Sequence, residues 1–400
     1  MAHLFSRMLA ALALCAWFTA HAAPGDLDTT FGSGTGKVIT AIGAGEATAN
    51  ALAVQPDGKI VVAGSCSNGN DVDLCIARYN TNGALDATFG NGGKVLTNVA
   101  DNGDNAYAIA VQPDGKIVVA GSCLIIITNS CLARYSANGV LDITFGTDGI
   151  AAPFITLYGN VANALAIQPD GKLVIVAQCY HGGTGLDFCL ARFSANGELD
   201  PTFGSAGLVF TDLSIYDDIP RALVVQPDGK ILVAGSCSDT FCLARYNANG
   251  VLDATFGSSG TVIVFSGGTN IGRALALLHD GRIVIAGECF FGGWDFCLSR
   301  FSANGALDTS FGSSGRVVTP IGSNNDYARA LALQPDGKLV VAGYCWNGTK
   351  NDVCLARYNA NGSLDTSFNT TGKLISPIGA NDSVATAVAL QPDGKIVVAG

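Results

Sequence analysis

Short apolar runs separated by turn sequences recur along the whole chain. The first repeat contains four of them: "ANALAVQ" at 49–55, "KIVVAGSC" at 59–66, "LCIARYN" at 74–80 and "GKVLT" at 93–97. Each run has the length of a β-strand. The run "KIVVAG" is apolar at consecutive positions, which is typical of a strand covered on both faces of its sheet. The pattern therefore predicts small four-stranded sheets that are buried between neighbouring sheets.

The turn between the first two runs, Pro56-Asp57-Gly58, predicts a hairpin, because proline presets φ, aspartate fits the third position and glycine the left-handed one. The turn phrase recurs at spacings of 57, 56, 58, 52, 56 and 57 residues, and a second phrase, "LDxxFG", also recurs. Seven copies at one period indicate an array of one supersecondary unit. The turn phrase begins at Gln55, Gln112, Gln168, Gln226, Leu278, Gln334 and Gln391.

Repeats of this length and strand content predict an all-β, seven-bladed β-propeller of four-stranded blades. A linear solenoid is the alternative, although its repeats are usually shorter. We expect a lone outer strand at 37–40, and two strands of the seventh blade at the end of the chain. The third-strand phrase "C(L/I)(A/S)R(Y/F)" occurs only six times. The last blade is therefore expected to be incomplete: either the natural chain continues past Gly400, or the blade is left with an unpaired edge.

The stretch "ALALQPDGKLVVAG…CLARYNANGSLDTSFNTTGKL" within 330–374 resembles the delta-60 repeat, a family of bacterial secreted and surface proteins. The resemblance covers essentially the whole chain after residue 22, and its motifs are long and specific. It implies a propeller fold and an exported protein. It supplies no activity and no catalytic residues, so the function has to be inferred from the residues themselves.

The N-terminus predicts an export signal, because Arg7 precedes an apolar segment and the small-x-small sequence at 20–22. We expect a signal peptide at 1–22 and a single β-propeller domain of about seven delta-60-like repeats at 23–400. The protein would then be secreted, periplasmic or at the cell surface. No later segment reaches membrane-spanning length, so no membrane span is expected.

Composition and charge narrow the classes of partner. Apolar residues make up 48% of the chain and charged residues 14%, and there are 51 glycines, which is typical of short buried strands and tight turns. The net charge is −10, and the basic residues are spread along the repeats. A nucleic-acid binder needs a positive stripe to displace counterions, so no nucleic-acid partner is expected.

Twelve of the 13 cysteines fall into pairs that bracket the loop between the second and third strands of a unit. The thirteenth, Cys15, lies in the predicted signal peptide, and a lipid anchor on it is disfavoured because Leu14 is too large for that processing site. Paired positions on neighbouring antiparallel strands are within disulfide reach, and an even count suits an exported chain. Two cysteines per unit give only half a zinc site, which disfavours metal binding. The predicted disulfides are Cys66–Cys75, Cys123–Cys131, Cys179–Cys189, Cys237–Cys242, Cys289–Cys297 and Cys345–Cys354.

No catalytic residue is assigned. Each complete third strand carries an arginine, but a catalytic site normally breaks repeat symmetry, so we predict a structural pair with the "LDxxFG" aspartate. His279 occupies a turn position, and no partner constellation accompanies His181. A phosphate-binding loop, a Ser-His-Asp set and a nucleophilic cysteine are not recognisable. The arginines are Arg78, Arg134, Arg192, Arg245, Arg300 and Arg357.

The loops between the paired cysteines differ in every repeat, whereas the "PDGK" and "NANG" turns barely change. In a propeller these loops emerge on the same face as the loops between blades. Their aromatic residues suit a sugar or peptide surface. The alternative is that the rings pack over the blade tips. The ligand-binding candidates are Tyr180, His181, Phe290, Phe291, Trp294 and Trp346.

Acidic turns between the predicted blades offer oxygen ligands of the kind that Ca²⁺ takes. None of them shows a full D-x-D-x-D-G loop, so solvated turns are the alternative. The candidate Ca²⁺ ligands are Asp101, Asp104, Asp217, Asp218, Asp326 and Asp382. No other cofactor is indicated.

These features favour an exported, non-enzymatic binding or surface-interaction module that uses the cysteine-paired loop face. Its partner would be a protein or a glycan at the cell surface. The alternative is an exported enzyme acting on a polysaccharide or small ligand, with a site on the loop face or in the central channel, with or without the assistance of Ca²⁺. A third hypothesis treats the repeat as a spacer.

Overall fold

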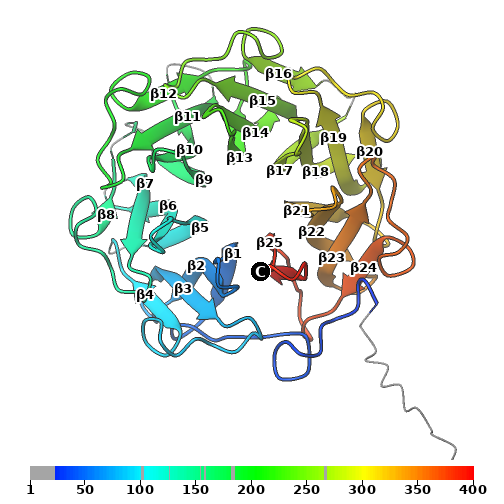
Figure 1. Ribbon diagram of the computed structural model, residues 1–400, viewed down its shortest axis with the longest axis horizontal. Helices are drawn as coiled ribbons and strands as arrows, with labels where there is room; N and C mark the ends of the chain where they lie inside the picture. The colour runs from blue at the N-terminus through cyan, green and yellow to red at the C-terminus, as the bar shows by residue number, and fades with distance from the viewer. Residues whose placement is uncertain are drawn as a thin grey trace, which may run out of the picture.

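The computed structural model describes residues 23–100, 103–125, 127–153, 155–156, 159–181, 185–264 and 268–400. The predicted signal peptide, residues 1–22, lies outside this described part. The described elements are β-strands arranged as a ring of radial sheets (Figure 1), so the prediction of an all-β propeller fold is confirmed. Over the same residues, the structure contains no helix with the length and hydropathy needed to cross a bilayer.

Six four-stranded antiparallel sheets form the blades, and each blade runs outwards from the axis in chain order (Figure 1). The first two blades contain β1 (Ala47–Val54), β2 (Ile60–Ser67), β3 (Val72–Tyr79), β4 (Lys94–Thr97), β5 (Asp104–Val111), β6 (Ile117–Leu124), β7 (Thr128–Tyr135) and β8 (Ile150–Ala151). The next two contain β9 (Asn160–Ile167), β10 (Leu173–Tyr180), β11 (Leu186–Phe193), β12 (Leu208–Thr211), β13 (Asp218–Val225), β14 (Ile231–Cys237), β15 (Thr240–Tyr246) and β16 (Thr261–Val264). The last two contain β17 (Asn270–Leu277), β18 (Ile283–Phe290), β19 (Trp294–Phe301), β20 (Arg316–Thr319), β21 (Asp326–Leu333), β22 (Leu339–Trp346), β23 (Asn351–Tyr358) and β24 (Lys373–Ser376).

The repeated turn phrase forms the hairpin between the first two strands of each unit. In the first blade the Gly58 N–H donates to the Gln55 carbonyl at 2.8 Å, and the Lys59 N–H donates to Asp57 Oδ1 at 3.1 Å. Gly58 has a φ of 82°, a left-handed conformation that glycine adopts without steric cost. The turn chemistry read from the sequence therefore explains the hairpin.

The second and third strands of the blades are buried along nearly their whole length. Every residue of β14 and β15 is buried, because both faces of the sheet lie against neighbouring blades. Apolar clusters accordingly join adjacent blades, as where Leu243 and Phe256 of the fourth blade pack with Ile283 and Phe301 of the fifth. The core of the protein is thus a series of layers between blades.

The prediction of seven four-stranded blades is wrong. The structure contains six such blades and a separate two-stranded sheet, β25 (Ala387–Leu390) with β26 (Ile396–Ala399). Residues 37–40, expected to form an outer strand, form no strand. The physical reason is that an outer strand needs a third strand to pair with, and no segment of the described chain occupies that place beside β26.

The two-stranded sheet lies between the sixth and first blades, with β25 beside β1 (Figure 1). The Thr386 hydroxyl donates to the Ala49 carbonyl of β1 at 2.7 Å. On the other side, the Asn369 N–H donates to the Pro24 carbonyl at 2.7 Å, so the N-terminal segment contacts the sixth blade. Both ends of the described chain therefore meet at one place in the ring.

The six predicted cysteine pairs all lie at disulfide distance. Their Cα–Cα separations range from 5.6 to 6.0 Å, within the usual span for a disulfide. Each pair joins the second and third strands of one blade beside the loop that connects them. This geometry fits a disulfide-bonded protein whose variable loops are held at their base.

Each blade also contains an arginine–aspartate pair that is largely buried and covered by a phenylalanine ring. In the first blade Arg78 Nε donates to Asp86 Oδ2 at 2.8 Å, and the guanidinium lies 4.5 Å from the centre of the Phe89 ring. Arg78 Nη1 also donates to the Ala137 carbonyl of the second blade. The structural role predicted for these arginines is confirmed. The pairs are Arg78–Asp86, Arg134–Asp142, Arg192–Asp200, Arg245–Asp253, Arg300–Asp308 and Arg357–Asp365.

Replacing one member of such a pair should strongly destabilise the protein. The side chains of Arg245 and Asp253 are 9% and 6% exposed, so Asp253→Asn leaves a buried guanidinium without its counter-charge. We expect a loss of about 3 kcal/mol in the free energy of unfolding, measured by urea denaturation under non-reducing conditions. Asp228→Asn, at an exposed turn carboxylate, is the matched control and should change it by less than about 1 kcal/mol. Equal urea midpoints for the two variants would contradict a stabilising role for the pair.

Candidate functional site

The loops on the cysteine-paired loop face form hydrogen bonds with one another across blade boundaries. Asp217 Oδ1 accepts a hydrogen bond from the Leu186 N–H at 2.9 Å, where the third strand of the preceding blade begins. Asp382 Oδ1 accepts from the Asn351 N–H at 3.0 Å in the same way. These two candidate Ca²⁺ ligands therefore connect neighbouring blades. Asp101, a third candidate, lies outside the described residues.

Three further Ca²⁺ candidates, Asp104, Asp218 and Asp326, are the first residues of inner strands and are fully buried. Asp218 Oδ2 accepts the N–H groups of Leu213 and Ser214 at 2.6 and 3.0 Å. Burial raises the pKa of all three carboxyl groups, although these backbone hydrogen bonds oppose the effect. Each carboxylate thus organises the loop that precedes its own strand.

One group of carboxylates in the described part of the chain could hold a cation. Ligand oxygens of Asp187, Asp212 and Asp218 lie within 4.8 Å of one another. Burial, and then the charges of Asp212 and Asp218, raise the pKa of Asp187. Oxygen ligands of this kind suit Ca²⁺. Sequence reasoning identified Asp218 but missed its two neighbours, because they belong to other strands and loops.

The Asp218→Asn variant should change how stability depends on pH. The pKa of Asp218 in the folded protein is raised above its unfolded value of about 3.9. Between these two pKa values the folded wild type binds more protons than the unfolded chain, so its free energy of unfolding falls as the pH rises. Asparagine already occupies this position at Asn160 and Asn270, so the substitution suits the fold. Measured by thermal unfolding in EDTA, the melting temperature of the variant relative to wild type should be higher at pH 7 than at pH 4. If the melting temperature of the variant relative to wild type is instead higher at pH 4 than at pH 7, the raised pKa of Asp218 is contradicted.

The aromatic candidates occupy different environments. Tyr180 and Phe291 are 50% and 57% exposed. His181 stacks on Phe210, with ring centres 4.0 Å apart. Trp346 is half-buried, and its carbonyl accepts the Ser323 N–H at 2.9 Å. These four candidates lie on several blades and form no common group with one another.

A second set of rings forms a continuous row, which we call the aromatic row: Phe290, Trp294, Tyr327 and Tyr344. Successive ring centres lie 5.4, 6.3 and 4.9 Å apart. Phe290 is 46% exposed at the loop of the fifth blade. Tyr327 lies on the inner strand of the sixth blade, and Tyr344 lies on its second strand. The row therefore leads from the exposed loop face towards the inner strands.

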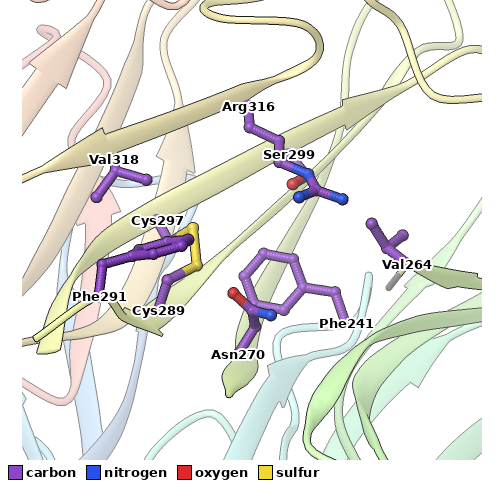
Figure 2. Close-up of a pocket in the computed structure, with 9 residues that line it drawn as sticks. All are labelled: Phe241, Val264, Asn270, Cys289, Phe291, Cys297, Ser299, Arg316 and Val318. Carbon is purple, nitrogen blue, oxygen red and sulfur yellow. A yellow bond between two sulfur atoms is a disulfide. The ribbon is translucent and has the colours of Figure 1, made fainter. Parts of the chain in front are cut away.

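A small cavity lies beside the outer strands of the fourth and fifth blades. Figure 2 shows the side chains that line it, which include the rings of Phe241 and Phe291 and the disulfide Cys289–Cys297. Its volume of about 20 Å³ is near that needed for one water molecule. It is therefore too small for an organic ligand.

At the inner end of the aromatic row lies an arginine cluster, which we define as Arg221, Arg273 and Arg329 together with Glu288. Arg273 donates to Glu288 Oε1 from Nε at 2.9 Å and from Nη2 at 2.6 Å. Arg329 Nη1 lies 3.5 Å from the same oxygen, while its Nη2 donates to the Tyr344 hydroxyl at 2.8 Å. The guanidinium of Arg329 also lies 5.2 Å from the Tyr344 ring centre. Charge and aromatic surface thus meet at this point.

The hydrogen bonding of the arginine cluster is incomplete. Arg221 Nε is buried and has no hydrogen-bond partner among the described residues, and neither has Glu288 Oε2. Burial, and then the charge of Arg273, lower the pKa of Arg221 to about 10. Three positive charges face one negative charge here, within a chain whose net charge is −10. The cluster therefore carries a local positive excess and unused polar groups.

A β-bulge explains why the arginines lie where they do. In each of the six complete inner strands the fourth residue is left out of the pairing with the second strand. A bulge re-aims the side chain of its extra residue. The fourth position could have been found by aligning the repeats, because only there do three successive units read "RAL". The residues at this position are Asn50, Tyr107, Asn163, Arg221, Arg273 and Arg329.

Comparison with a family model gives six matches along the chain. The model, a domain of unknown function (DUF5122) described as a beta-propeller, matches residues 55–89, 112–145, 168–203, 226–256, 279–311 and 334–368. Each stretch begins at the first residue of the hairpin-turn phrase, except in the fifth repeat, where it begins one residue later. Each stretch ends at the phenylalanine of "LDxxFG". Six matches agree with six blades. The prediction of a β-propeller repeat family is confirmed, whereas the narrower name delta-60 repeat is not.

Solved structures with similar folds are distant in sequence. A streptogramin B lyase structure is 11% identical, over 88% of this chain and 90% of that chain, with a TM-score of 0.53. A protein from Lactobacillus plantarum is 14% identical, over 79% and 83% of the two chains, with a TM-score of 0.49. The first of these likenesses shows the fold alone. No curated protein matches the chain.

Proposed function

We propose that this chain, which belongs to the DUF5122 beta-propeller family, is an exported, non-enzymatic module that binds a glycan on its loop face. The observation that carries the proposal is the aromatic row, which begins at the exposed ring of Phe290 and continues through three ring contacts. Flat aromatic rings present apolar area at low entropic cost, and sugar rings offer apolar C–H faces that stack on them.

Export is supported by the cysteines. Six pairs at disulfide distance suit an oxidising compartment and are rare in a reducing one. The expected signal peptide at 1–22 belongs to the same proposal. A binding module, rather than an enzyme, is favoured because the buried arginine–aspartate pairs repeat in every blade and are occupied with structural contacts.

Ligand binding to the aromatic row should be visible in tryptophan fluorescence. Trp294 lies within the row, and Trp346 is the only other tryptophan after the predicted signal peptide. Titration of the full exported chain with a panel of oligosaccharides should change the emission of Trp294, and the change should vanish in Trp294→Phe but persist in Trp346→Phe. Phe290→Ala should weaken the binding about tenfold, which corresponds to about 1.4 kcal/mol.

Tyr216→Ala is the matched control, because Tyr216 is 66% exposed on the same face but lies outside the row. Its affinity should equal that of the wild type. If short peptides but no oligosaccharide change the Trp294 emission, the partner is a protein and the glycan assignment fails. Shortened or unsaturated sugars formed by the wild type, but not by Phe290→Ala, would contradict the non-enzymatic assignment.

A further inference from the structure

We propose that the arginine cluster binds the carboxylate of an acidic sugar, so that the ligand of the loop face is an anionic glycan such as a polyuronate. The inference deepens the proposed function and rests on it for the glycan part of the ligand. Its own basis is the incomplete hydrogen bonding of Arg221 and Glu288, an observation independent of the exposed rings.

The chain itself shows what a purely structural residue does at the fourth inner-strand position. Asn50 Nδ2 donates to the Ala106 carbonyl of the next blade at 2.9 Å, and Asn163 Nδ2 donates to the Pro220 carbonyl at 2.7 Å. Small polar residues at this position thus connect adjacent inner strands. Arg221 does not make the corresponding bond to the Gly272 carbonyl, and its Nε is left without a partner in the described structure.

An unpartnered, buried guanidinium N–H costs stability, because the group has lost water without gaining a replacement hydrogen bond. Arg273 and Arg329 add two further positive charges beside it, and Glu288 Oε1 neutralises only one. Like charges placed together raise the free energy of the protein alone. A bound carboxylate would relieve both costs, since it accepts charge-assisted hydrogen bonds and supplies the missing negative charge.

Glu288 adds a second requirement for the ligand, a hydrogen-bond donor. Its side chain is 1% exposed, and Oε2 has no hydrogen-bond partner among the described residues. An ionised carboxylate oxygen accepts hydrogen bonds, so Glu288 Oε2 would accept one from a donor on the ligand, such as a hydroxyl. A uronic acid carries a carboxylate and hydroxyl groups on one ring. The same ring has C–H faces for Tyr344 and Tyr327 at the inner end of the aromatic row.

The test compares two ligands with the same sugar backbone: a galacturonate hexamer, which is anionic, and its full methyl ester, which is neutral. Isothermal titration of the full exported chain should show the free acid binding at least about tenfold more tightly at low salt, with the difference shrinking as NaCl screens the charges. In Arg221→Asn the preference for the acid should disappear, while the affinity for the methyl ester stays unchanged.

Asparagine is chosen because the chain uses it at the same position in two other blades. Arg221→Asn should therefore fold, and its melting temperature should equal or exceed that of the wild type. Arg273 is left intact because its loss would remove both hydrogen bonds that it donates to Glu288 Oε1. Arg282→Asn, which removes a positive charge from a hairpin turn outside the cluster, is the control and should keep the preference for the acid.

The outcomes separate this inference from the proposed function. If the wild type binds acid and ester equally, or if Arg221→Asn still prefers the acid, the carboxylate site is wrong although the loop face binds glycans. If neither hexamer binds, but sodium acetate raises the melting temperature of the wild type and not of Arg221→Asn, the carboxylate site stands and the glycan function fails. If neither hexamer binds and acetate has no such effect, both fail.

Discussion

The buried arginine–aspartate pair is the interaction on which the arrangement of blades depends. The aspartate neutralises the guanidinium within one blade. In the first five blades the arginine Nη1 also donates to a backbone carbonyl of the next blade, as from Arg245 to Ala303 at 2.6 Å. A buried charge is tolerated only when it is paired and its hydrogen bonds are satisfied. Each of the first five blades therefore depends on the next blade to complete the hydrogen bonds of its buried arginine.

Because the blades share one regular framework, a residue that differs from its equivalents in other blades indicates a role specific to its own blade. The bulge places the fourth inner-strand residue of each complete blade at an equivalent point near the axis, so the fold supplies six equivalent positions and the sequence decides what each does. Asn50 and Asn163 complete inter-blade hydrogen bonds, whereas Arg221 leaves a buried N–H unused. Local violations of otherwise consistent rules are expected at functional sites, because binding requires groups that the protein itself has not satisfied.

Much of the local structure could be predicted from the sequence. The hairpin turn at Gly58 and the pairing of cysteines such as Cys237 and Cys242 depend on residues close together in the chain, so their spacing was sufficient. The number of blades was predicted wrongly, because a repeated turn phrase counts hairpins and not complete sheets. The facing carboxylates of Asp187 and Asp218 were missed for a related reason, since they lie on adjacent blades.

By itself, the sequence determined the unit: strand lengths, the left-handed glycine turns, the cysteine pairs and the arginine–aspartate motif, all of which follow from short-range spacing. Only the tertiary structure decided how many units become blades, and which side chains of different units meet. Phe290, Trp294, Tyr327 and Tyr344 form one row, and Arg329 pairs with Glu288, only because the ring brings successive blades side by side. These contacts join residues of different repeats, so the spacing within one repeat cannot reveal them.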